Sequence, residues 1–264
     1  MPCSGSAAEV ILKRSTNFHD YLAWIEKGGG YTAEALDHLV HSMRQDADGA
    51  KNSGEGRLRP SLIGDQCDRK QILSYRFAGG SSYKGSWEAW SGTWLHLAFQ
   101  AYLLALYPDR MRIEHRVAPS RGRLGVTGKA DWYWYGKPAV GNMSIIEGPH
   151  MGDYKTIGKT AWVEKAPREM HVQQILFEMF TLDVKQGYLV YQNRYFGGNM
   201  ITWDVIAEQS DFDKCEERLE RLQSHIDSEV FPDLLEPCKA MSGPYETCNW
   251  RDKCFEVALQ ETGE

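Results

Sequence analysis

The sequence lacks several features that would place the chain in special classes of protein. It has no apolar run approaching the ~20 residues that a membrane-spanning helix requires. Its first residues, Met1 to Gly5, lack the charged start and apolar stretch of a secretory signal. Six cysteines in 264 residues are too few for a disulfide scaffold. We therefore expect an intracellular, cytoplasmic protein with reduced thiols and no membrane partner.

Basic residues are not in excess either. Lys and Arg number 30 against 36 Asp and Glu, which gives a formal net charge of −6. This excludes polyanion binding driven by overall charge, although a local basic groove stays compatible with it. What the chain does have is 42% hydrophobic residues, including 9 Trp, 13 Tyr and 9 Phe. The composition thus excludes a disordered or collagen-like chain and supports a sizeable buried core.

The residue pattern divides the chain near residue 57. The first part carries two helical patterns and then a polar stretch typical of a flexible linker, at 18–25, 33–43 and 46–57. We therefore predict an N-terminal helical extension and linker over residues 1–57. The remaining residues, 58–264, are predicted to form one domain.

Helical and extended patterns alternate in this second part. Helices are predicted over 61–77, 92–107, 168–183 and 210–230. Strands are predicted over 111–117, 122–135, 144–147, 153–156, 187–195 and 200–206. Because Pro149 cannot pair within a central strand, a bulge or loop is expected before Asp153. The order of elements predicts an α/β fold, with a mixed central β-sheet flanked by helices.

One group of residues has the chemistry of phosphodiester hydrolysis. Asp153 and Lys155 are two positions apart on a predicted strand, so their side chains share a face. Asp131 ends the preceding strand, where antiparallel pairing would bring it beside Asp153. With His96 from a predicted helix, two carboxylates, an imidazole and a lysine would suit a divalent-metal site that holds a phosphate. Taken singly, these residues have ordinary alternatives: a solvated Asp–Lys pair on a strand and a histidine packed in the core.

Four short motifs follow one another along the chain. They are Gly92-Thr93-Trp94-Leu95-His96, Gly128-Lys129-Ala130-Asp131, Asp153-Tyr154-Lys155-Thr156 and Gln174. In this order and spacing they resemble the RecB-like branch of the PD-(D/E)XK nuclease superfamily over about residues 58–256. The run from Gln174 to Phe180 also resembles the glutamine helix of lambda-type phage exonucleases, which selects Gln174 over Gln173. The resemblance implies a PD-(D/E)XK, restriction-endonuclease-like core.

The resemblance also implies roles for individual residues. The ligands of a Mg²⁺ or Mn²⁺ ion would be His96, Asp131, Asp153 and the backbone carbonyl of Tyr154. Lys155 would activate the attacking water or stabilise the transition state, and Gln174 would orient Lys155 or the substrate. The predicted catalytic residues are therefore Asp131, Asp153, Lys155 and Gln174.

A second predicted site consists of cysteines. Clustered thiols in an intracellular chain suggest metal binding. CRISPR-associated and AddB-like members of the same family hold a [4Fe-4S] cluster with four cysteines, which correspond here to Cys67, Cys238, Cys248 and Cys254. Five residues separate Cys248 from Cys254, as in the family, but nine separate Cys238 from Cys248 where two are typical. Tetrahedral Zn²⁺ and four unrelated buried thiols are the alternatives.

The leading functional hypothesis is a metal-dependent DNA exonuclease acting in recombination, repair or DNA-end processing, including a phage-encoded one. Its partners would be DNA, single-stranded or with duplex ends, and a recombination or single-strand-binding protein. Two alternatives stay open: a CRISPR-adaptation nuclease that acts with an integrase, and a non-catalytic nucleic-acid-binding module on the same fold.

Overall fold

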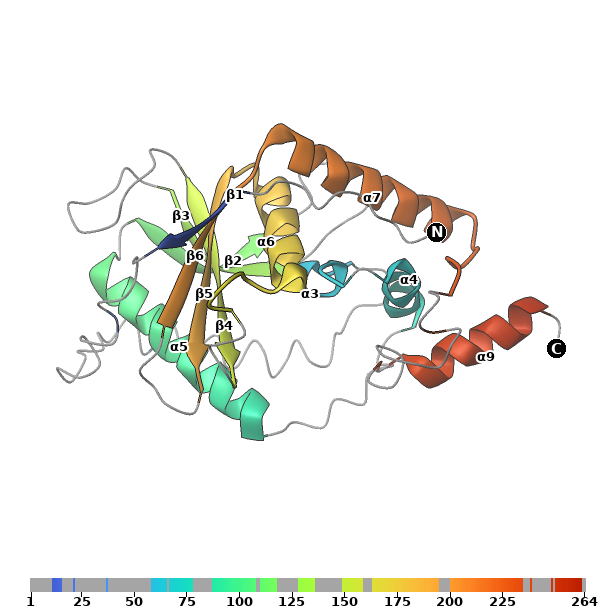
Figure 1. Ribbon diagram of the computed structural model, residues 1–264, viewed down its shortest axis with the longest axis horizontal. Coiled ribbons are helices and arrows are strands. Elements are labelled where there is room, and N and C mark those ends of the chain that lie inside the picture. The colour runs from blue at the N-terminus through green and yellow to red at the C-terminus, as the bar shows by residue number, and fades with distance from the viewer. Residues whose placement is uncertain are drawn as a thin grey trace.

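The computed structural model describes residues 11–15, 21, 37, 58–65, 67–77, 87–107, 110–117, 128–135, 149–158, 163–194, 200–234, 238, 248 and 250–262. In these ranges the chain forms a six-stranded sheet with helices on both faces (Figure 1). The predicted helices 18–25 and 33–43, the linker and the strand 144–147 lie outside the described residues, apart from Tyr21 and Asp37.

The sheet is mixed, with the strand order β1-β6-β5-β4-β3-β2. Its strands are β1 (Ile11–Ser15), β2 (Met111–Val117), β3 (Gly128–Trp134), β4 (His150–Ile157), β5 (Gln186–Asn193) and β6 (Met200–Ile206). Only the pair β4–β5 runs parallel among these strands, and the crossover between them carries helix α6 (Glu169–Leu182). The predicted fold class, a mixed central sheet flanked by helices, is confirmed.

The helices are α3 (Pro60–Ile63), α4 (Asp68–Arg76), α5 (Trp87–Leu106), α6, α7 (Gln209–Asp227) and α9 (Arg251–Thr262). The helix predicted over 61–77 is wrong in one respect, because it is two helices. Cys67 caps the second of them, where its Sγ accepts the Lys70 N–H at 3.4 Å. No helix in the described part of the chain is long and apolar enough to cross a membrane.

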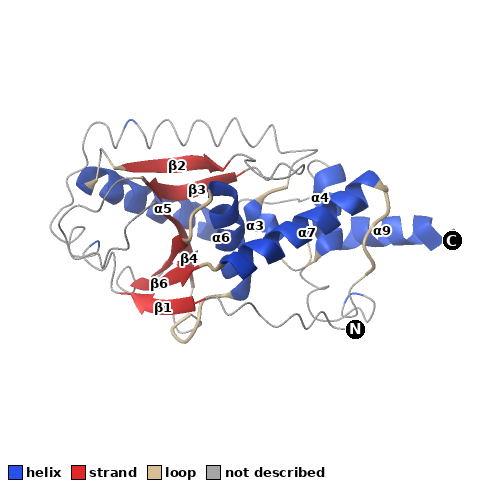
Figure 2. Cartoon of the chain, turned by 90° about the horizontal axis from the view of Figure 1, so that it is seen from above, coloured by secondary structure: helices blue, strands red, loops and turns tan. Residues whose placement is uncertain are grey.

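The sheet separates two hydrophobic clusters. Helix α5 packs on one face, where Phe99 and Tyr102 meet Trp132 and Tyr154. Helix α6 packs on the other face, where residues such as Ile175 join the side chains of β4, β5 and β6. Seen from above, α7, α4 and α9 extend to one side of the sheet (Figure 2). The two helices nearest the site are therefore held against opposite faces of one sheet.

Strand β4 begins directly after Pro149 and runs without interruption to Ile157. Of the bulge or loop expected before Asp153, a bulge within the strand is not found, because Pro149 precedes the strand and takes no part in its pairing. Gly152 is needed within it, since a Cβ there would overlap the indole ring of Trp132. Close packing against β3 therefore fixes β4 immediately before the predicted catalytic residues.

Part of the predicted N-terminal extension belongs to the sheet. Strand β1 pairs antiparallel with β6, from Ile11 opposite Ile206 to Ser15 opposite Thr202. Tyr21 is buried and packs edge-on against Phe99, with a ring-centroid distance of 5.1 Å. The domain boundary at residues 57 and 58 stays a prediction, but these contacts cross it.

Candidate active site and metal centre

Two buried carboxylates face each other across β3 and β4. Backbone pairing of these strands continues to Trp132 opposite Gly152, so that the next opposite positions are Asp131 and Asp153. There the backbone pairing stops, and the N–H of Tyr154 donates instead to Oδ2 of Asp131 at 2.6 Å. Asp131 and Asp153 are 8% and 3% exposed. Two carboxylates held this close with little water need positive charge nearby.

Lys155 supplies part of this positive charge. Its Nζ lies 2.8 Å from Oδ2 of Asp153 and donates to Oε1 of Gln174 at 3.1 Å. The other end of the Gln174 amide donates to Oε1 of the buried Glu178 at 3.0 Å. Because Asp153 and Lys155 lie on the face of β4 that packs against α6, the helix delivers Gln174 directly to the ammonium. Gln174, and not Gln173, makes this contact.

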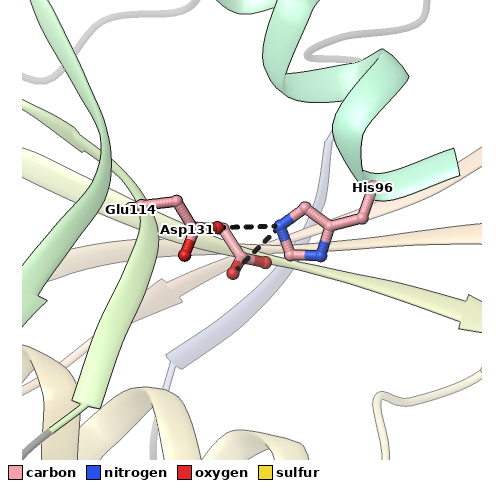
Figure 3. A group of neighbouring side chains, drawn as sticks. All are labelled: His96, Glu114 and Asp131. Atoms are coloured by element: carbon pink, nitrogen blue, oxygen red, sulfur yellow. Dashed lines mark ion pairs between the residues drawn. The ribbon is translucent and has the colours of Figure 1, made fainter. Parts of the chain in front are cut away.

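His96 approaches Asp131 from α5. Its Nε2 lies 3.2 Å from Oδ1 of Asp131 and 3.7 Å from Oε1 of Glu114, which comes from β2. The three side chains point toward one another (Figure 3). Their ligand atoms all lie within 4.8 Å of one another, a spacing that a metal ion can bridge. An imidazole with two carboxylates suits Mn²⁺ and, through the oxygens, Mg²⁺.

The pKa values of these side chains depend on their burial and on the charges of their neighbours. Burial raises the pKa of Asp153, Lys155 lowers it and Asp131 raises it again, to about 7. Burial lowers the pKa of Lys155, but attraction to Asp153 and Asp131 outweighs burial and raises it above its usual value. For His96, too, the attraction of Asp131 outweighs burial, so its pKa is raised. In the metal-free protein these carboxylates therefore favour the charged form of Lys155.

Helix α5 comes unusually close to β4 at Gly92, one turn before His96. A Cβ at this position would lie 2.8 Å from Oγ1 of Thr156, the residue after Lys155. The glycine of the first motif thus has a packing reason: it lets the helix carry His96 to the sheet.

The structure brings together His96, Asp131, Asp153, Lys155 and Gln174, the residues that the motifs single out. The side chain of Tyr154 packs in the core and its N–H serves Asp131, so the predicted role of its carbonyl as a ligand stays a prediction. The motifs miss Glu114, Gln100 and Glu178. Of these, Glu114 had a sequence signal, because antiparallel pairing of strands 111–117 and 122–135 is able to place an acidic residue near Asp131.

The four predicted cluster cysteines line one pocket, between the start of α4 and α9. Cys67, Cys238, Cys248 and Cys254 share it with apolar side chains such as Leu73 and Trp250. Burial raises the pKa of the Cys67 thiol to about 11, with the Lys70 N–H opposing this and the neighbouring Asp65 and thiols adding to it. Cys215 lies apart from this pocket and is buried on α7.

No protein-family model and no curated protein sequence matches the chain. Solved structures do match it in backbone arrangement. The alkaline exonuclease LHK-Exo from Laribacter hongkongensis is 9% identical, with a TM-score of 0.47 over 69% of this chain and 93% of that one. LHK-Exo in complex with dAMP is also 9% identical, with a TM-score of 0.48 over 66% and 90%. The protein SSO0001 is 14% identical, with a TM-score of 0.41 over 64% and 77%.

Proposed function

We propose that the chain is a divalent-metal-dependent deoxyribonuclease that hydrolyses phosphodiester bonds. The observation that carries the proposal is the meeting of His96, Asp131, Asp153, Lys155 and Gln174 from two strands and two helices at one place on the sheet. A chance set of surface residues would not be buried together with opposite charges in direct contact.

The roles of the side chains follow from their charges and contacts. A divalent cation bound by the carboxylates and His96 would polarise a phosphoryl oxygen and lower the pKa of a bound water. Lys155, held as an ammonium beside the carboxylates, would stabilise negative charge on the phosphate. Gln174 accepts a hydrogen bond from Lys155 and thereby orients its ammonium.

We further propose exonucleolytic action at DNA ends, in recombination, repair or end processing. This choice rests on the resemblance of the Gln174 helix to that of lambda-type exonucleases. A CRISPR-adaptation nuclease and a non-catalytic DNA-binding module are the alternatives. The buried Asp153–Lys155 pair disfavours the second, because a binding scaffold has no need to keep a carboxylate with a raised pKa beside an ammonium.

The test is cleavage of end-labelled linear DNA and of circular DNA by purified protein with Mg²⁺ or Mn²⁺. We expect wild-type protein to release nucleotides from linear ends, and EDTA to stop it. Asp153→Asn should lower the rate at least ~10²-fold, whereas Asp213→Asn, an equal charge change on the exposed face of α7, should not. DNA binding without cleavage would favour the non-catalytic DNA-binding module. Cleavage by the Asp153 variant at the wild-type rate would exclude this active site.

For the cysteine pocket we propose a structural metal cluster of the [4Fe-4S] type. Its support is that four thiols, one at the N-cap of α4 and three from the C-terminal region, line a single pocket. The choice of an iron–sulfur cluster follows the resemblance of the four-cysteine set, and tetrahedral Zn²⁺ is the alternative.

Metal analysis of anaerobically purified protein tests the cluster. About four irons per chain and a brown colour are expected, while one zinc and no iron would favour the tetrahedral site. Cys254→Ser should remove the iron and lower the melting temperature. Cys215→Ala, which deletes a thiol outside the pocket, should keep the iron. Full iron content in the Cys254 variant would remove this residue from the cluster.

A further inference from the structure

We propose that Glu114, a residue that the nuclease motifs do not include, is a further metal ligand and forms a cation subsite with His96 and Asp131. The proposal deepens the proposed function, on which it rests for the chemistry of the centre. It is carried by the position of Glu114 in the sheet, by the spacing of three ligand atoms and by the buried amide of Gln100.

Glu114 belongs to a row of carboxylates across three neighbouring strands. The pairing of β2 with β3 continues on both sides of Glu114 and puts it opposite Asp131, which in turn is opposite Asp153. Like charges at directly opposite positions destabilise a sheet. The backbone at Glu114 also has a φ of 50°, which is uncommon for a residue other than glycine, and the pairing is interrupted there. The sheet thus tolerates repulsion between neighbouring carboxylates and an uncommon backbone conformation at the row of Glu114, Asp131 and Asp153.

The spacing of the ligand atoms fits one cation. Adjacent ligands of a cation with bonds of about 2.1 Å lie about 3 Å apart. Nε2 of His96 is 3.2 Å from Oδ1 of Asp131 and 3.7 Å from Oε1 of Glu114 (Figure 3). These distances need only small side-chain movements to close on an ion. Lys129, which lies 3.2 Å from the other oxygen of Glu114, occupies the outer side of the carboxylate.

A fully buried amide holds Glu114 in this position. Gln100 lies one turn after His96 on α5, and its Nε2 donates to Oε1 of Glu114 at 2.6 Å and to the carbonyl of Asp131 at 3.3 Å. The same nitrogen is 2.8 Å from Nε2 of His96, so the amide meets all three members of the subsite. Its oxygen has no hydrogen-bond partner among the described residues. Leaving this oxygen unpaired is costly, and the short hydrogen bond from Nε2 to Glu114 offsets part of that cost.

The competing explanation is that Glu114 serves only as a counter-charge for Lys129. Mn²⁺ titration of the full chain without DNA, by calorimetry or by electron paramagnetic resonance, separates the two. If Glu114 is a ligand, Glu114→Gln weakens Mn²⁺ binding at least ~10-fold, while Lys129→Met does not weaken it. Asp213→Asn controls for the loss of one negative charge. Unchanged Mn²⁺ affinity in Glu114→Gln overturns the proposal.

Gln100 gives a second, independent readout. As a positioning residue it acts through Glu114, so Gln100→Met should weaken Mn²⁺ binding by about 10- to 100-fold. In the double variant with Glu114→Gln, the second change should cost less than it does alone, because residues that act as a unit are not additive. Additive losses would contradict the positioning role.

These outcomes are distinguishable from those of the nuclease test. Mn²⁺ binding that depends on Glu114 in a protein that cleaves no DNA would keep the subsite and remove the nuclease. Cleavage that depends on Asp153, with Mn²⁺ binding indifferent to Glu114, would keep the nuclease and remove the subsite.

Discussion

Nζ of Lys155 lies 2.8 Å from Oδ2 of Asp153, two residues earlier on the same strand, and the Asp153 side chain is almost completely buried. The pair fixes an ammonium beside the carboxylates in a place with little water. Burial alone would lower the pKa of Lys155, but the neighbouring carboxylates raise it. The carboxylates therefore favour the charged form of the side chain.

The first prediction concerns this charge. Lys155→Met should lower kcat by about 10²- to 10³-fold, because it removes electrostatic stabilisation from the transition state. Lys155→Arg should recover part of the rate, since it keeps the charge but not the compact geometry. Single-turnover cleavage, with DNA affinity measured separately, checks both. Equal rates for Met and Arg would show that the charge itself is not used.

Glu178 offers a test of whether Gln174 orients Lys155, because neither of these two residues needs to be changed. It accepts a hydrogen bond from Gln174, whose other end holds Lys155. Glu178→Leu removes the acceptor, and we expect an approximately 10-fold lower kcat with little change in KM. Glu178→Gln keeps an acceptor oxygen and should stay near the wild-type rate. Burial and the charge of Asp153 raise the pKa of Glu178 well above its usual value, so the neutral amide is a fair substitute.

The contact between α5 and β4 predicts a stability effect. Gly92→Ala would place a methyl group 2.8 Å from Oγ1 of Thr156 and should lower the free energy of unfolding by about 1–3 kcal/mol. Thr156→Ala removes that oxygen, so the double variant should regain much of the loss. Denaturant unfolding of the four proteins measures the coupling. Simple additivity would mean that the helix does not approach the strand as described.

His171 predicts a dependence of stability on pH. Burial and the charges of Lys155 and Arg168 lower its folded-state pKa to about 3. Between this value and its unfolded-state value of about 6.5, the unfolded chain binds the extra proton. His171 therefore makes the free energy of unfolding decrease as the pH falls through this range, by up to about 1.4 kcal/mol per pH unit.

His171→Gln should remove this contribution. Because the raised pKa of Asp153 acts in the opposite direction, the informative quantity is the difference between variant and wild type from pH 4 to pH 7. We expect that difference to change with pH in favour of the variant at the acid end. A difference that is constant with pH would place His171 in contact with water.

Elements with a strong local pattern were predictable from sequence. The predicted helix 168–183 and strand 200–206 match α6 and β6 closely, because their apolar periodicity is set by neighbouring residues alone. The break between α3 and α4 was not predictable, since Arg218 of α7 stabilises it through the carbonyls of Ile63 and Asp65. Such a contact is invisible in the local sequence.

The residues of the candidate site also fall into those that the sequence predicts and those that it does not. Asp153 and Lys155 were predicted to share a face from their spacing, and the motif order brought in His96, Asp131 and Gln174. Glu114 and Gln100 follow from strand register and from the crossing of α5 over the sheet, neither of which a short motif encodes. The cluster cysteines were identified by resemblance, because their meeting depends on α9 returning to α4.

Strand β1 has a consequence for how this protein is handled. It covers the outer edge of β6, whose residues include the apolar Ile201, Trp203 and Val205. An uncovered edge strand of this kind presents unpaired backbone groups to any other extended chain, including a second copy of the same protein. Trimming the chain to residues 58–264 would therefore do more than delete an appendage: it would open the sheet to self-association.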